Sequence, residues 1–288
     1  MLILPLLLQA VTPAPAPAPV NVPANVPPPQ TPPAGSSLLS PAETRALACQ
    51  DMVADDPDAA IAEAQSWIAA NGGAFALQCL GSAHFAKGSY ADAARAFADA
   101  ARTTGAHDPA SLWMQAGNAA LAAGDAAGAR GHFDAALALG HLSGRALGEA
   151  HLDRARAALA LGDMAAGRAD LDAAIAQNSR TDPLVWLLSA TLARRQGDLA
   201  RAANDIAQAA VLSPQNPDIA LETGNIAAAR NDVPAALRAW QEASNWGGAG
   251  HAASVARAHI LEAEAIARDA AGATAPAAPA AATPPQLR

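Results

Sequence analysis

One short pattern recurs five times along this chain of 288 residues. Each copy has a turn residue, then an acidic or hydroxyl residue, then an alanine-rich stretch, and the turn residues are Gly88, Gly124, Gly162, Gly197 and Asn231. The spacings between them are 36, 38, 35 and 34 residues. A period in this range is the signature of a solenoid, in which each unit buries its apolar face only against its neighbours.

Each unit is predicted to be two helices joined by a tight turn. Glycine or asparagine suits the left-handed conformation that ends the first helix. The next residue is able to accept a hydrogen bond from the first free amides of the second helix. It is Ser89, Asp125, Asp163, Asp198 or Asp232. The second helix has a small residue five positions after the turn residue, a bulky residue nine positions after it and an alanine twelve positions after it. These spacings place all three on one face of the helix.

The stretch LQCLGSAHFAKGSYADAARAFADA, residues 77–100, matches most of a known repeat signature. It resembles the tetratricopeptide repeat (TPR), which combines W-x2-L-G-x2-Y, A-x3-F and a following proline. The early tyrosine is missing and Leu77 stands at the tryptophan position, which Trp113 and Trp186 occupy in later units, and a later unit has Pro214 at the expected proline. The resemblance implies an all-α fold, a right-handed α-solenoid of antiparallel helix pairs. The repeat region is expected over 41–248, with repeats at about 41–71, 74–104, 109–139, 144–178, 182–212 and 216–246.

Segments of different composition flank the repeats. Residues 11–40 are rich in proline and alanine, and residues 271–288 are similar, so both are expected to be disordered tethers rather than domains. The first unit has Asp55 where glycine should stand and is expected to be a weak repeat. Because a terminal repeat cannot bury both faces, residues 249–270 are predicted to form a capping helix with an apolar face of Val255, Ile260, Leu261 and Ile266.

Residues 1–10, MLILPLLLQA, form an apolar run. A run this short does not span a bilayer, which takes about 20 residues, so no integral membrane span is expected. It resembles the apolar core and small-residue end of a signal peptide, although no lysine or arginine precedes it and Leu8 stands where a small residue is usual. We expect an exported protein of the bacterial periplasm or cell envelope. The alternatives are a start upstream of Met1, an unstructured apolar N-terminus, or a cytoplasmic protein.

Cys49 and Cys79 are the two cysteines of the chain. An even number in an exported protein permits a disulfide, which would staple the weak first unit to the next. Free cysteine also behaves as a small buried hydrophobic residue, so two unpaired cysteines are the other interpretation. The two positions are offset by about one helical turn, and helices pack about 8–10 Å apart, near the limit for a disulfide. Both interpretations stay open.

Charge and motifs argue against nucleic-acid binding and catalysis. The formal net charge is -8 and there is no lysine or arginine stripe, so no nucleic-acid partner is expected. The seven histidines include no HExxH motif, and the chain has no cysteine pair at zinc spacing, no P-loop, no dinucleotide fingerprint and no G-x-S-x-G. We therefore expect no catalytic residue, no metal and no cofactor.

The resemblance implies that the first helices line a concave groove, which holds a peptide or helix of a partner protein. The groove positions of the family are occupied here by Phe75, Gln78, Ser82, Phe85, Met114, Asn118, Leu121, Leu152, Arg156, Leu187, Thr191, Arg194, Leu221 and Asn225. An asparagine in the groove is able to bond a peptide backbone through both its carbonyl and its amide group. Asn118 and Asn225 are therefore candidates, and the alternative for each is a solvated polar position.

The carboxylate clamp of chaperone-binding family members is absent, since the matching positions include Met114, Asp153, Leu184 and Leu188. A mixed apolar and polar groove points instead to an apolar or amphipathic segment of a partner. The main expectation is a non-catalytic protein-binding scaffold. One alternative is a structural protein that self-associates through the solenoid edge or the C-terminal helix, near Trp240 and Trp246. Another is a cytoplasmic TPR adaptor.

Overall fold

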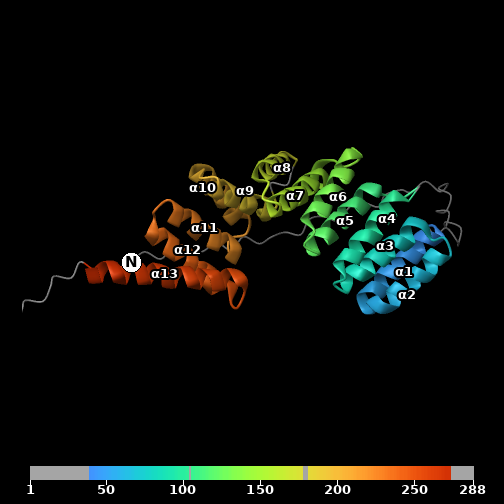
Figure 1. Ribbon diagram of the computed structural model, residues 1–288, viewed down its shortest axis with the longest axis horizontal. Coiled ribbons are helices and arrows are strands. Elements are labelled where there is room, and N and C mark those ends of the chain that lie inside the picture. Colours follow the sequence, from blue (N-terminus) through green and yellow to red (C-terminus); the bar gives the residue numbers. More distant parts are fainter. Residues whose placement is uncertain (1–38, 104, 178–180, 274–288) are drawn as a thin grey trace, which may run out of the picture. The chain divides into compact units, whose positions relative to one another are not determined.

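The chain folds into a series of α-helices, described in a computed structural model over residues 39–103, 105–177 and 181–273 (Figure 1). These residues contain thirteen helices and no strand. The helices are α1 (Pro41–Asp55), α2 (Pro57–Ala69), α3 (Gly73–Ala86), α4 (Tyr90–Arg102), α5 (Pro109–Ala122), α6 (Ala126–Ala138), α7 (Gly144–Ala160), α8 (Met164–Ala176), α9 (Pro183–Arg195), α10 (Leu199–Leu212), α11 (Pro217–Ala229), α12 (Val233–Gly247) and α13 (His251–Ala273). The predicted leader, nearly all of the predicted N-terminal tether and residues 274–288 lie outside the described residues.

Helices α1 to α12 form six consecutive pairs, and each pair packs on the next. Contacts join consecutive helices, and they also join the first helices of some neighbouring pairs, such as α1 to α3 and α9 to α11. This packing between nearest neighbours is that of a solenoid of antiparallel helix pairs, as the repeat period predicts.

The predicted turn residues adopt the left-handed conformation. The φ angles are 78° at Gly88, 79° at Gly124, 78° at Gly162, 81° at Gly197 and 60° at Asn231. The aspartate after each of the last four caps the next helix, and the Asp125 carboxylate, for example, accepts a hydrogen bond from Gly128 N at 2.8 Å. The prediction is wrong for Ser89, whose side chain makes no capping bond to α4. In the first pair α1 continues to Asp55, and Asp56 caps α2.

The core consists mainly of alanine, and bulky side chains pack on small residues of the first helices. Phe133 on α6 is 0% exposed. It lies against Gly117 on α5, where an added Cβ would come within 2.3 Å of the Phe133 ring. The same contact recurs between Gly224 and Trp240 in the last pair. In these pairs the missing Cβ of the glycine leaves room for the aromatic ring.

Gly131 is a glycine of α6 that the packing does not require. A Cβ added there meets no atom within 4 Å, so we expect Gly131→Ala to raise the free energy of unfolding by about 0.5–1 kcal/mol, because alanine favours a helix over glycine. Amide hydrogen exchange in α6 should slow. Urea denaturation checks the expectation, with Gly117→Ala as a control that should be destabilised. An unchanged or lower stability of Gly131→Ala would contradict it.

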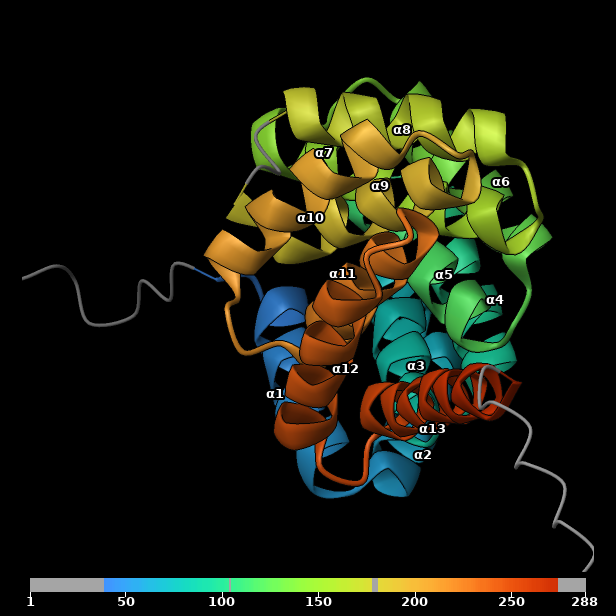
Figure 2. The same cartoon turned by 90° about the vertical axis from the view of Figure 1, so that its left-hand side faces the viewer.

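Helix α13 packs against α12 and also contacts α11 (Figure 2). Ala256 is buried, and Ile260 packs against the cluster that contains Trp240. Leu261 and Ile266 are 63% and 64% exposed, so the predicted apolar face is wrong for these two residues. Consecutive residues of a helix are turned by about 100°, and the alanines near the start of α13 bring the side with Ile260, rather than Leu261, onto α12.

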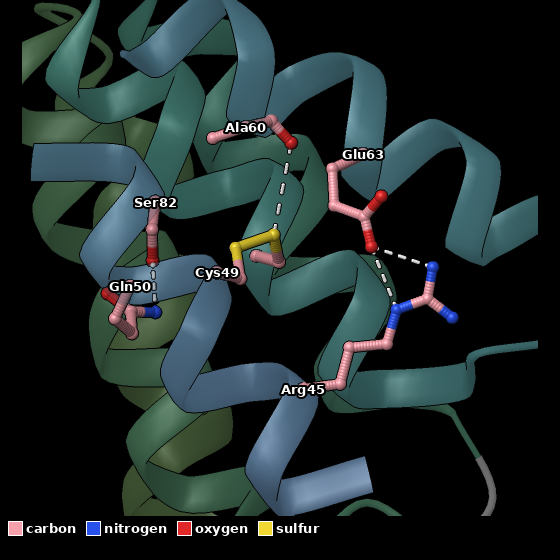
Figure 3. The surroundings of a disulfide bond; sticks show 7 residues. Arg45, Cys49, Gln50, Ala60, Glu63 and Ser82 are labelled. Carbon is pink, nitrogen blue, oxygen red and sulfur yellow. Dashed lines mark hydrogen bonds and ion pairs between the residues drawn. A yellow bond between two sulfur atoms is a disulfide. The ribbon is translucent and has the colours of Figure 1, made fainter. Parts of the chain in front are cut away.

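A disulfide joins Cys49 of α1 to Cys79 of α3 (Figure 3). Their Cα atoms are 6.0 Å apart, which is within the usual range for a disulfide. Each cysteine is 1% exposed, and Cys49 is the buried residue of α1. On the surface, Arg45 of α1 forms an ion pair with Glu63 of α2 at 2.7 Å. The disulfide is therefore at the centre of the interior contact between α1 and α3, and Val53 of α1 packs beside it.

Candidate binding face on the first helices

The predicted groove residues belong to the first helices α3, α5, α7, α9 and α11. We call the surface that they form the first-helix face. Most of these side chains are half-buried, whereas Phe85, near the end of α3, is 41% exposed, and Leu184, at the start of α9, is 38% exposed. The face consists of Phe75, Gln78, Ser82, Phe85, Ser111, Met114, Gln115, Asn118, Leu121, Asp153, Arg156, Leu184, Leu187, Thr191, Arg194 and Leu221. Glu222 of α11 is buried next to this face.

Hydrogen bonds between side chains join the first helices near the N-terminal end of the array. Gln50 Nε2 on α1 donates to Ser82 Oγ on α3 at 3.3 Å. Gln78 Nε2 on α3 donates to Gln115 Oε1 on α5 at 3.4 Å. Successive repeats are therefore linked through groups that also lie on the first-helix face.

The later repeats are linked in a similar way. Asn118 on α5 lies close enough to the carboxyl group of Asp153 on α7 to lower its pKa, and Arg194 Nε on α9 donates to Glu222 Oε1 on α11 at 2.6 Å. The acceptors Gln115, Asp153 and Glu222 all stand nine residues before the turn residue of their own repeat. Sequence reasoning missed them as a set because the residue type changes from repeat to repeat, although the shared position was visible.

Two predicted groove residues have other roles. Leu152 is 4% exposed and packs in the core with Val185, because its apolar side chain fills space beside α8 and α9. Asn225 is already engaged on both sides of its carboxamide: Oδ1 accepts a hydrogen bond from Trp240 Nε1 at 3.1 Å, and Nδ2 donates to Glu222 Oε2 at 3.1 Å. One N–H and one lone pair of this carboxamide already have partners within the protein, so Asn225 offers a peptide backbone fewer groups than the sequence predicts.

Asp153 is an acidic group of the first-helix face that is largely buried. Its side chain is 17% exposed and accepts a hydrogen bond from Arg156 Nη1 at 2.9 Å. Burial raises the pKa of Asp153 above its ordinary value, the bonds from Arg156 and Asn118 oppose the rise, and the nearby Glu149 adds to it. The free-energy cost of removing this carboxylate from water is therefore larger than the stabilisation that its hydrogen-bond partners provide.

Asp153→Asn is expected to raise the free energy of unfolding at neutral pH. Because the folded pKa of Asp153 lies above the unfolded one, the native state binds more protons between the two pKa values, and stability falls as the pH rises through that window. The asparagine side chain does not titrate, so the variant does not lose this stability as the pH rises. Urea denaturation should show a difference between variant and wild type at pH 7 that shrinks at about pH 3, below the usual range for carboxylates. The control is Glu262→Gln, at a position 73% exposed. A difference that is as large at the lower pH would contradict the expectation.

Two surface pockets lie where second helices of neighbouring pairs meet the first helix between them. One, of about 480 Å³, is lined by α10, α11 and the start of α12, with Arg230 and Asp232 among its residues. The other, of about 350 Å³, lies between α4 and α6 and includes Arg102 and His132. Alanine provides much of the lining of both.

In the described part of the chain no group of three or more His, Cys, Asp or Glu side chains is placed to hold a metal ion.

A buried polar network links α8, α9 and α10. Arg168 Nη1 donates a hydrogen bond to Ser189 Oγ at 2.7 Å, and Ser189 Oγ donates to Asp205 Oδ2 at 2.6 Å. Ser189 is 0% exposed, so its hydroxyl does not meet a substrate. Buried polar groups need bonding partners, and this network satisfies them where the fifth helix pair packs on the fourth.

The sequence over residues 80–249 matches a family model for the tetratricopeptide repeat, in windows of 80–149, 114–183, 152–217 and 187–249. The chain belongs to the tetratricopeptide repeat family. The TPR fold expected from the sequence, an all-α right-handed solenoid of antiparallel helix pairs, is confirmed. No curated protein sequence matches the chain significantly. None of the helices in the described ranges has both the length and the apolar character needed to cross a membrane.

Several solved TPR structures are similar in fold at low sequence identity. PilW, described as a type IV pilus biogenesis factor, has a TM-score of 0.62 at 16% identity, over 74% of this chain and 97% of that one. The APC/C hetero-tetramer Cut9-Hcn1 has a TM-score of 0.59 at 13% identity, over 77% of this chain and 42% of that one, so this chain spans less than half of its length. YrrB, described as a TPR protein with an unusual peptide-binding site, has a TM-score of 0.52 at 16% identity, over 67% of this chain and 96% of that one. These likenesses concern the fold.

Proposed function

We propose that this TPR array is a non-catalytic scaffold that binds a segment of a partner protein on its first-helix face. The observation that carries the proposal is the mixture of side chains on that face. Phe85 and Leu184 leave apolar surface exposed, and the carboxamides of Gln78 and Gln115 retain unused bonding groups. A bound segment would gain apolar contacts from Phe85 and Leu184 and hydrogen bonds from the two glutamines. The description of YrrB as a peptide-binding TPR protein supports this use of the fold.

Site-specific photocrosslinking in cells tests the proposal. A benzophenone amino acid would replace Phe85 or Leu184 on the first-helix face, and Val211, which is 78% exposed on α10, would serve as the control position. We expect a discrete crosslinked species from the first two positions and none from the third. Equal crosslinking at all three positions, or none on the face, would count against the proposal. Leu187 and Leu221 are less suitable because both also pack against the core.

We also propose that the protein works outside the cytoplasm, in the periplasm or cell envelope. The support is the disulfide between Cys49 and Cys79, because disulfides persist in oxidising compartments and are rare in the cytosol. Cells would be treated with a thiol-blocking maleimide during denaturation, so that every free cysteine is labelled. We expect neither cysteine to react, whereas two labelled cysteines would indicate a reducing compartment.

Self-association through α13 is a second candidate, supported by the exposure of Leu261 and Ile266. Light scattering on the full chain would then give a mass above that of one chain. Replacing both residues with serine should return the mass to one chain, because it removes the apolar contact. A mass of one chain for the unaltered protein at high concentration would exclude this role.

A further inference from the structure

Helices α3 and α5 give the first-helix face a part without formal charge. Among the residues of these two helices, His84 is the one ionisable side chain apart from the disulfide-bonded Cys79. The later first helices differ, since α7 contributes Asp153 and Arg156 and α9 contributes Arg194 to the face. Arg194 in turn pairs with the buried Glu222 of α11. We call the uncharged part the neutral segment, and its members are Phe75, Gln78, Ser82, Phe85, Ser111, Met114, Gln115, Asn118 and Leu121.

The hydrogen bonds within the neutral segment are long. Gln78 Nε2 lies 3.4 Å from Gln115 Oε1, and Gln115 Nε2 lies 3.3 Å from Ser111 Oγ. Both distances are beyond the usual range of about 2.7–3.2 Å for such bonds, so these contacts are weak. Each carboxamide has two N–H donors and an oxygen that accepts, and within the described residues Gln78 Oε1 accepts no hydrogen bond. The two glutamines therefore have donors and acceptors to offer a ligand.

We propose that the neutral segment binds an extended, uncharged stretch of the partner protein, with backbone groups of the stretch bonded to Gln78 and Gln115. The inference rests on the proposed function and specifies its partner. A ligand charge held against Gln78 and Gln115 would lose hydration, and neither α3 nor α5 has an acidic, lysine or arginine side chain to pair with it. A peptide N–H and C=O match the two kinds of group that a carboxamide presents. Small apolar side chains of the stretch would contact Phe85, Met114 and Leu121.

The same chemistry argues for an extended ligand rather than a helical one. The backbone groups of a helix are bonded within the helix, except at its ends, so a helix would leave the carboxamides of Gln78 and Gln115 without partners. An extended strand has free backbone donors and acceptors along its length. An amphipathic helix would also bring charged side chains close to the neutral segment.

Selection from a phage-displayed library of random 12-residue peptides tests the inference on the full-length protein. Three proteins would be compared: wild type, Gln115→Glu, and the control Gln208→Glu on α10, whose side chain is exposed. We expect peptides selected by the wild type and by the control to contain a run without Lys, Arg, Asp or Glu. Peptides selected by Gln115→Glu should gain Lys or Arg in that run. A synthetic wild-type-selected peptide should bind Gln78→Met roughly 2–10-fold more weakly, the loss expected for one hydrogen bond.

The outcomes separate this inference from the proposed function. Wild-type selections that enrich charged peptides, or enriched peptides that ignore both glutamine substitutions, would overturn the neutral segment as the binding site and leave a scaffold that binds elsewhere. Selections with no enrichment over uncoated beads would count against peptide binding as a whole. Circular dichroism melting of each variant checks that the helices remain folded, and a variant that melts early would be replaced by the matching substitution at the other glutamine.

Discussion

Phe133→Ala is expected to lower the free energy of unfolding by about 3–5 kcal/mol, the cost of removing a fully buried aromatic ring. The ring is 0% exposed and packs on Gly117. The neighbouring core residues Ala129 and Ala136 have side chains that end at Cβ, so they cannot fill the cavity left behind. Urea denaturation followed by circular dichroism measures the loss. Because each repeat contacts only its neighbours, native-state hydrogen exchange should show the loss first in α5 and α6.

The matched control for Phe133→Ala is Val211→Ala, which truncates a side chain that is 78% exposed on another second helix. A surface change of this kind usually alters stability by no more than about 0.5 kcal/mol. A loss in Phe133→Ala that is no larger than the loss in the control would contradict the close packing of the ring on Gly117.

Replacing both Cys49 and Cys79 with serine is expected to destabilise the first helix pair by about 3–4 kcal/mol, from the chain-entropy model for a loop of this size. The cysteines are 30 residues apart in sequence. Since Cys49 is the buried residue of α1, its loss should release α1 while α3 stays packed against α4. Hydrogen exchange should therefore become fast in α1 and remain slow in α9 to α12.

Reduction provides the control for the cysteine variant. The wild-type protein treated with a phosphine reductant should show the same fast exchange in α1, whereas the variant should not respond to the reductant. Slow exchange in α1 of the variant would mean that surface contacts such as the Arg45–Glu63 ion pair hold the helix without the disulfide, and the expectation would be wrong.

The helix pairs could be predicted from the sequence because their turns are local. Gly124 and Asp125 determine the end of one helix and the start of the next through backbone conformation and a capping bond within a few residues. Neither effect depends on how the repeats pack. The same reasoning failed at Ser89, where the hydroxyl residue follows the turn glycine but makes no capping bond.

The first-helix face was harder to predict because it depends on how one repeat packs on the next. Helical periodicity gives the side of a helix on which a residue lies, but not the rotation between neighbouring repeats. Leu152 was expected on the face and is in the core, and Asn225 was expected to be available and is bonded to Trp240. Whether Cys49 and Cys79 form a disulfide could not be decided from the sequence for the same reason. The usual distance between packed helices does not specify the 6.0 Å between their Cα atoms.

The alanines of the core also control the geometry of the surface. Alanine loses no rotamer freedom when it is buried, and its small size determines how far apart neighbouring helices stand. Enlarging a buried alanine such as Ala116, next to Gln115 on α5, would push α5 away from its neighbours and change the distance from Gln115 to Gln78. The spacing of the two glutamines can therefore change through substitutions at buried alanines, which alter the pitch of the repeats without changing the surface residues themselves.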